Sequence, residues 1–272
     1  MPRPLDYLIT NDDGIHAPGL LALRNAYRNR ARFLVAAPSS QRSAVGHAIT
    51  IHRPIICDEV PLAGGGTGWS IDGTPADCVK LALGELATSR PRFVLSGINF
   101  GDNLGINVYY SGTVAAALEG AFCGLPSFAL SLATKSDPLF TEAAKTARWI
   151  VRKFAPLIDG TPICLNVNIP NVPFRKIRGV RIARQAHTPY EDLFHRRRDP
   201  RGRVYFWMDG SKAPAKPGRA RGHEMTDVDS VRAGYVSITP LRLTMTCEAT
   251  FESLAGSIAM RPGRTDARRP VR

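Results

Sequence analysis

Short apolar runs alternate with helical patterns through the first 170 residues of the chain. Continuous apolar runs bounded by turn residues are typical of strands buried on both faces, and they occur at residues 5–10, 32–38, 93–99, 126–132 and 163–170. Apolar positions at helical spacing predict helices at residues 17–30, 75–86, 111–124 and 139–156. This alternation predicts a doubly wound α/β fold, in which helices cover both faces of a mostly parallel sheet.

Beyond the last of these strands the pattern changes. Segments 178–187 and 203–210 look extended and are joined by the charged segment 190–202, which predicts a β-hairpin or arm in place of further α/β units. Segment 212–222 is rich in Pro, Gly and basic residues and predicts a mobile loop. Segment 227–241 predicts a short helix that leads into a strand.

The length favours one large domain with an appendage. With 272 residues, of which 44% are hydrophobic, the chain can bury a substantial core. We expect a single α/β domain over residues 1–260, with its core at about 1–170 and an extension at about 171–260. Residues 261–272 are expected to form a basic, disordered tail.

The net charge of +13 is concentrated in the last hundred residues. Residues 171–272 carry 21 Lys and Arg against 10 Asp and Glu, whereas residues 1–170 carry 15 against 13. A strongly basic part can contact nucleic acid, an acidic membrane surface or a small phosphorylated substrate, or it can be a solvated arginine-rich surface. The charge alone leaves these alternatives open.

Cysteine usage and hydropathy favour a reduced protein of the cytoplasm. The five cysteines have no close pairing, which argues against both a disulfide framework and a zinc knuckle. Asp6 interrupts the first apolar run, so no signal-like segment is seen at the start. Glu119 interrupts the longest run of small apolar residues, and no stretch reaches membrane-spanning length. We therefore expect a cytoplasmic protein without a membrane partner.

Polar residues gather where the predicted strands end. In a doubly wound sheet, ligands bind outside the carboxyl ends of the strands. Four polar clusters follow such ends, at residues 11–13, 39–43, 96–99 and 99–113. Their positions predict that they converge in one crevice.

The adjacent carboxylates Asp12 and Asp13 form the most unusual of these clusters. Two like charges held close repel one another unless a cation or a shared proton compensates them. Mg²⁺ and Mn²⁺ bind carboxylate, hydroxyl and amide oxygens, and Ser43 and Asn99 could add neutral oxygens from neighbouring strand ends. An Asx turn made by Asn11 or Asp12 explains the same residues at least as well. Taken alone, the pair leaves both interpretations open.

A second candidate site lies at the start of the alanine-rich helix. Gly112 and Thr113 open this helix, where unpaired backbone N–H groups beside a hydroxyl form a phosphate site. Ordinary capping by Ser111 or Thr113 is the alternative. The similar segment 73–79 also places Gly-Thr before a helix, and capping is the favoured role there.

The chain lacks the motifs of covalent catalysis. It contains no G-x-S-x-G elbow, no phosphatase loop of the form C-x5-R and no Walker A motif. Its six histidines lack H-E-x-x-H or other close metal spacing. This pattern favours hydrolysis by a metal-activated water.

Several ordered motifs resemble the SurE family of survival-protein nucleotidases. They are "TNDDGIHAPGL", "VAAPSSQRSAVGHAIT", "DGTPADCVKLAL", "SGINFGDNLG" and "YYSGTVAAALEG", followed by "LNVNIP", "DPRGRVYFW" and "GYVSITPL". The resemblance covers roughly residues 5–245. So many matches in one order make a chance resemblance improbable.

The resemblance implies a Rossmann-like core with a C-terminal extension used to form a homodimer or homotetramer. It also implies removal of phosphate from nucleoside 5′- or 3′-monophosphates, with one divalent ion, Mg²⁺ or Mn²⁺, per subunit. Catalysis would rest on Asp12 and Asp13. The implied metal ligands are Asp12, Asp13, Ser43 and Asn99, and the implied phosphate contacts are Asn11, Asn99, Ser111, Gly112 and Thr113.

Two positions depart from the family pattern. Ser39-Ser40 stands where an acidic-basic pair is common, and Ile106-Asn107 where an acidic residue is common, so substrate preference could differ.

Two other protein classes carry acidic residues after the first strand, but neither fits. A haloacid-dehalogenase phosphatase needs Asp-x-Asp there, whereas this chain has Asp12-Asp13-Gly14. A receiver domain has about half this length. Binding of nucleic acid or polyphosphate by the basic C-terminal part stays as the alternative function.

Overall fold

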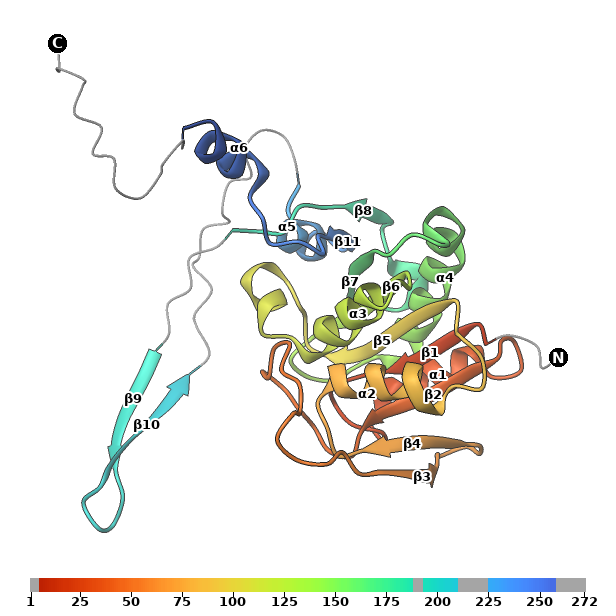
Figure 1. The fold of residues 1–272 in the computed structure, drawn as a ribbon, viewed down its shortest axis with the longest axis horizontal. Helices are drawn as coiled ribbons and strands as arrows, with labels where there is room; N and C mark the ends of the chain where they lie inside the picture. The colour runs from red at the N-terminus through yellow and green to blue at the C-terminus, as the bar shows by residue number, and fades with distance from the viewer. Residues whose placement is uncertain (1–4, 188–192, 210–224, 258–272) are drawn as a thin grey trace, which may run out of the picture.

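The computed structural model describes residues 5–187, 193–209 and 225–257. Nine strands form the main sheet: β1 (Tyr7–Thr10), β2 (Phe33–Pro38), β3 (Cys57–Pro61), β4 (Thr67–Ile71), β5 (Phe93–Phe100), β6 (Ser127–Ala133), β7 (Cys164–Pro170), β8 (Val180–Ile182) and β11 (Val236–Leu241). Their spatial order is β3-β4-β2-β1-β5-β6-β7-β11-β8. All neighbours from β4 to β7 pair in parallel, whereas β3 and β11 run antiparallel to β4 and β7 (Figure 1).

Helices cover both faces of this sheet (Figure 1). On one face, α1 (Pro18–Tyr27) packs against α4 (Phe140–Ile158). On the other face, α2 (Pro75–Leu81) packs against α3 (Gly112–Phe122). Helices on both faces of a mostly parallel sheet confirm the predicted doubly wound α/β class.

Two layers of buried side chains hold the helices to the sheet. Leu20 of α1 and Ile150 of α4 are fully buried in a cluster with Phe128 of β6. On the opposite face, Val79 of α2 is fully buried against Leu8 of β1. Each such aliphatic side chain contributes about 1.5–3 kcal/mol when it is removed from water. These layers fix the strand ends from which the site is built.

The last part of the described chain returns to the sheet. β8 pairs in parallel with β11, which follows α5 (Asp227–Arg232), as the helix-then-strand pattern of residues 227–241 predicted. α6 (Glu248–Ser257) comes after β11 and was not predicted. The expected loop at 212–222 and the expected tail at 261–272 lie outside the described residues. The division into a core and an extension stays a prediction.

The predicted hairpin exists, but with different strands. β9 (Leu193–Arg198) pairs antiparallel with β10 (Val204–Asp209) and stands away from the main sheet (Figure 1). The charged segment 190–202 therefore supplies a strand as well as the turn, and β8 belongs to the main sheet, so the predicted pairing was wrong. Because the arginines of β9 lie exposed on a two-stranded ribbon, the sequence carries no apolar alternation there.

Two smaller regions of secondary structure differ from the prediction. β3 and β4 were missed, since β3 is a short edge strand with charged residues and β4 contains a glycine. The α-helix expected over 75–86 ends at Leu81, and a π-helical turn, Ala82–Leu86, follows it.

All five cysteines are free thiols. Within the described residues, no helix is long and apolar enough to span a bilayer.

Candidate active site

The carboxyl ends of β1, β2 and β5 meet at one edge of the sheet. Asp12 and Asp13 follow the end of β1, separated from it by Asn11. The backbone N–H of Arg42, after β2, donates to the carbonyl oxygen of Asp12 at 2.8 Å. The backbone N–H of Phe100, at the end of β5, donates to Oδ2 of Asp13 at 3.2 Å. The chain neighbours of these two donors are Ser43 and Asn99, so the structure brings all four predicted metal ligands into one region.

The start of α3 touches the acidic pair. A Cβ atom built on Gly112 would lie 2.7 Å from Cβ and 2.9 Å from Oδ2 of Asp12, so only glycine permits this approach. The hydroxyl of Thr113 donates a hydrogen bond to Oδ1 of Asp12. The predicted cation site and the predicted phosphate site are therefore in direct contact.

Burial makes Asp12 an unusual carboxylate. It is only 4% exposed. Its pKa is raised to about 6, chiefly by burial; the hydrogen bond from Thr113 acts in the opposite direction, and the charge of Asp13 adds to the rise. Burial also raises the pKa of Asp13, against the effect of the Phe100 N–H. Each shift shows that the folded protein disfavours negative charge at this place in the absence of a compensating cation.

The side chains around the pair suit a divalent cation. Within the part of the chain that the structure describes, no Lys, Arg or His forms an ion pair with Asp12 or Asp13. No group of three or more His, Cys, Asp and Glu suited to a metal occurs among those residues, so neutral oxygens would have to complete the coordination. Hard ions such as Mg²⁺ accept such mixed oxygen ligands. The donor set therefore fits a hard divalent cation.

Ser43 and Asn99 present those neutral oxygens. Ser43 is exposed, and its Oγ accepts a hydrogen bond from Nε2 of Gln41 at 2.9 Å. The amide nitrogen of Asn99 donates to the carbonyl oxygen of Gly101 at 3.0 Å. That bond orients the Asn99 side chain without using its Oδ1, the atom that a cation would bind.

Asn11 shapes the turn that carries the pair. Its side-chain nitrogen donates to the carbonyl oxygen of Gly14 at 3.1 Å, and the N–H of Gly14 donates to its Oδ1 at 3.2 Å. Gly14 has φ of 108°, a conformation that favours glycine. The Asx-turn interpretation is thus correct for Asn11, and the turn leaves the carboxylates of Asp12 and Asp13 for other partners. The predicted contact between Asn11 and the phosphate stays a prediction.

Ser111 caps α3, which was the alternative to a phosphate site at the start of this helix. Its Oγ accepts a hydrogen bond from the N–H of Val114 at 3.1 Å. Capping by Ser111 does not use the N–H groups of Gly112 and Thr113, which as the first residues of the helix have no intrahelical acceptor. With the positive end of the helix dipole, these N–H groups suit an anion that lies beside Asp12.

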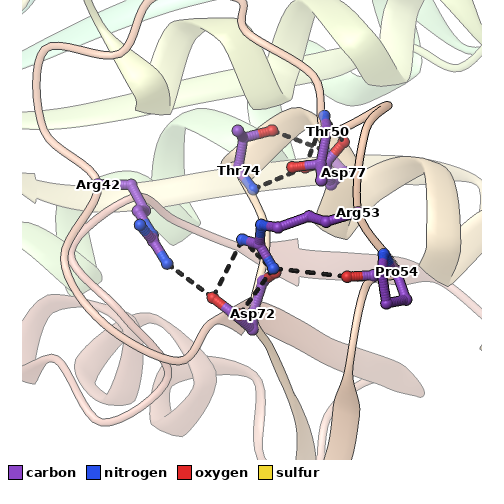
Figure 2. Close-up of polar contacts among 7 residues, drawn as sticks. All are labelled: Arg42, Thr50, Arg53, Pro54, Asp72, Thr74 and Asp77. Atoms are coloured by element: carbon purple, nitrogen blue, oxygen red, sulfur yellow. Dashed lines mark hydrogen bonds and ion pairs between the residues drawn. The ribbon is translucent and has the colours of Figure 1, made fainter.

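Sequence reasoning missed the polar network beside the site. Figure 2 shows Arg42 and Arg53 meeting at Asp72, next to Asp77 at the start of α2. The sequence signal in this region was the capping of α2, which is confirmed: Thr74 and Asp77 form a capping box. The arginine contacts bridge residues 19 to 30 positions apart, and no local pattern marks such pairs.

The chain matches known proteins over most of its length. The family model described as "Survival protein SurE" matches residues 7–192. A 5′-nucleotidase SurE of Desulforudis audaxviator is 46% identical over 253 residues, covering 91% of this chain and 95% of the relative. A 5′-nucleotidase SurE of Heliobacterium modesticaldum is 43% identical over 240 residues, covering 88% of this chain and 86% of the relative.

A solved structure is also similar. The crystal structure of SurE protein from Aquifex aeolicus superposes with a TM-score of 0.78 at 36% identity and covers 93% of this chain and 99% of that one. The family model matches well over half of the chain, and both relatives exceed 40% identity across most of it. The chain therefore belongs to the SurE family.

Proposed function

We propose that the chain is a divalent-metal-dependent nucleotidase that removes phosphate from nucleoside 5′- or 3′-monophosphates. The observation that carries the proposal is the contact of Asp12 with the first residues of α3. The hydroxyl of Thr113 bonds to Asp12. A carboxylate suited to a cation therefore lies beside helix N–H groups suited to a phosphate. Relatives named 5′-nucleotidase support the same reaction class.

Asp12, Asp13, Ser43 and Asn99 would hold one divalent cation, Mg²⁺ or Mn²⁺, per subunit. When bound, such an ion lowers the pKa of a coordinated water and neutralises phosphate charge. Asp12 and Asp13 supply the negative charge that attracts the ion. Both carboxyl groups have raised pKa values in the protein without a cation. A bound cation would lower these pKa values and so favour the ionised forms that bind it.

The residues at the start of α3 would bind the phosphate. The N–H groups of Gly112 and Thr113 donate to its oxygens and stabilise the charge that develops during transfer. Ser111 fixes these donors by capping the helix, and Thr113 also orients Asp12 through its hydroxyl. Asn99 would contact both the cation and the substrate.

Phosphate release from a panel of nucleotides tests the proposal. The full chain is treated with a chelator, divided, and assayed with nucleoside 5′- and 3′-monophosphates before and after Mn²⁺ or Mg²⁺ is restored. We expect release from at least one nucleoside monophosphate that stops with the chelator and returns with the ion. Release that is insensitive to the chelator, or no release from any nucleotide, contradicts the proposal.

A binding role for the hairpin is the second candidate, supported by its composition. Arg197 lies opposite Tyr205 in the β9–β10 ladder, and Arg196 opposite Phe206, with all four side chains exposed. Arginine beside exposed aromatic rings suits single-stranded nucleic acid. Binding of a labelled oligonucleotide should then weaken steeply with salt, and a titration without salt dependence would exclude this role.

Assembly into a homodimer or homotetramer stays a proposal as well. Phe206, Trp207 and Met208 of β10 are each more than half exposed, and exposed apolar side chains of this size favour contact with another chain. Light scattering of the full chain measures the mass directly. The monomer mass at micromolar concentration would contradict the proposal.

A further inference from the structure

The segment of residues 39–56 crosses the site without regular secondary structure. It connects β2 to β3 and carries Ser43. Two backbone bonds tie it to the site: the N–H of Arg42 donates to Asp12, and the N–H of Gly46 donates to the carbonyl oxygen of Tyr110 at 3.1 Å. Since no helix or strand holds this segment, the position of Ser43 depends on a small number of tertiary contacts.

One carboxylate joins the two ends of this segment (Figure 2). Nη2 of Arg42 donates to Oδ1 of Asp72 at 2.8 Å. From the other end, Nη1 of Arg53 donates to Oδ2 of Asp72 at 2.7 Å, and its Nη2 donates to the Asp72 carbonyl oxygen at 3.1 Å. Asp72 therefore closes residues 42–53 into a loop fastened to the turn between β4 and α2.

A second carboxylate, in the first turn of α2, holds the loop at Thr50. The N–H of Thr50 donates to Oδ1 of Asp77 at 3.0 Å. Burial alone would raise the pKa of Asp77, but hydrogen bonds from Thr50 and Thr74 outweigh it and lower the pKa. Asp77 is thus a fixed, ionised acceptor in the capping box of α2. The turn that carries Asp72 is therefore itself well anchored.

Arg42 connects Asp72 to the candidate cation site. Its backbone N–H bonds to Asp12, it precedes Ser43, and its guanidinium reaches Asp72. The side chain is 34% exposed, and within the described residues its Nε is buried without a hydrogen-bond partner. Without the carboxylate of Asp72, this partly desolvated cation would lose its counter-charge and would gain by turning toward water. That movement would displace Ser43.

We infer that Asp72 is a positioning residue, which holds Arg42 and Arg53 so that the loop presents Ser43 to a divalent cation at Asp12 and Asp13. The inference rests on the proposed function, because it needs a cation at the acidic pair. Ion pairs as exposed as these two contribute little to the free energy of unfolding. The effect of Asp72 is therefore expected in the metal site and in loop mobility, with little change in global stability.

The test compares D72A with D58A in the full-length protein. Asp58 is an exposed carboxylate on the adjacent strand β3 and serves as the matched control. Mn²⁺ binding is measured by electron paramagnetic resonance, and amide hydrogen exchange is measured across residues 39–56. We expect D72A to bind Mn²⁺ about 10-fold more weakly, the lower end of the loss typical for outer-shell partners. Exchange in residues 39–56 should accelerate, and D72E should recover part of both losses.

The possible outcomes separate this inference from the proposed function. Wild-type Mn²⁺ affinity and wild-type exchange in D72A, with Mn²⁺ bound by the wild type, would overturn the inference alone. A wild type that binds no Mn²⁺ would overturn the inference and the proposed function together. If D72A fails to fold, R53A is tested in its place. It removes the ion pair between Arg53 and Asp72, the more exposed of the two pairs, and should also weaken Mn²⁺ binding and accelerate exchange in residues 39–56. Wild-type behaviour of R53A in both measurements would then overturn the inference.

Discussion

Replacing Asp12 with Asn should stabilise the metal-free protein while it removes activity. The amide of Asn has nearly the shape of the carboxyl group and keeps an oxygen that can accept the bond from Thr113. It carries no charge, so the cost of burying an ionised carboxylate disappears. The same change removes a proposed metal ligand, and we expect phosphate release to fall by orders of magnitude.

The size of the stabilisation follows from the pKa of Asp12. This pKa rises from its ordinary value of 3.8 to about 6 in the folded protein. Because the folded-state pKa is the higher one, protonated Asp12 contributes stability that is fully present below pH 3.8 and is lost as the pH rises through about 6. A shift of this size corresponds to about 3 kcal/mol at neutral pH. Burying the amide hydrogens of Asn offsets part of it, leaving a gain of roughly 2–5 °C in Tm.

Thermal unfolding in chelator, followed by circular dichroism at pH 7.5 and near pH 4, checks this prediction. D12N should melt above the wild type at pH 7.5, and the difference should shrink toward pH 4, where Asp12 of the wild type becomes protonated. The control D58N changes an exposed carboxylate and should melt like the wild type. Saturating Mn²⁺ should raise the Tm of the wild type but not that of D12N, since a ligand stabilises only the state that binds it.

A D12N variant that melts below the wild type in chelator at pH 7.5 would refute this reasoning. It would mean that the ionised carboxylate is satisfied within the fold and that its role is structural. If Mn²⁺ raised the Tm of both proteins equally, the cation would bind at a site that does not include Asp12.

Three further substitutions test the packing around the site. G112A places a Cβ 2.7 Å from Cβ of Asp12, which must push α3 away, so we expect a destabilisation of about 1–3 kcal/mol in urea unfolding and a clear loss of phosphate release. T74A removes the cap that faces Asp77 and should cost about 1 kcal/mol by the same unfolding measurement. F128A opens a cavity at a fully buried position and should cost about 3–5 kcal/mol, seen as a lower urea midpoint with an unchanged slope.

The sequence predicted the layers of the fold because their signals are local. The buried strands β1, β2, β5, β6 and β7 are continuous apolar runs, and the main helices show apolar residues at helical spacing. Edge strands lack such signals. β3 carries charged residues at the sheet edge, and β9 consists largely of exposed arginine and histidine, so neither produced a strand pattern.

The site was predictable as a set of clusters but not as a set of contacts. Position after a parallel strand was enough to place Asp12 and Asn99 near each other, because parallel strands end at one sheet edge. Whether Asn11 served the turn or the substrate could not be read from its position, since the same amide can do both. The contact between Gly112 and Asp12 joins residues one hundred positions apart, and only the folded chain reveals it.

Mn²⁺ binding by the wild type and by D12N tests the central claim most directly. The protein is freed of metal, titrated with Mn²⁺ at pH 7.5, and the free ion is followed by electron paramagnetic resonance. The account predicts one bound ion per chain in the wild type and loss of that ion in D12N, with the fold of D12N intact by circular dichroism. Equal binding by the two proteins, or no binding by the wild type, would contradict a cation site at Asp12 and Asp13.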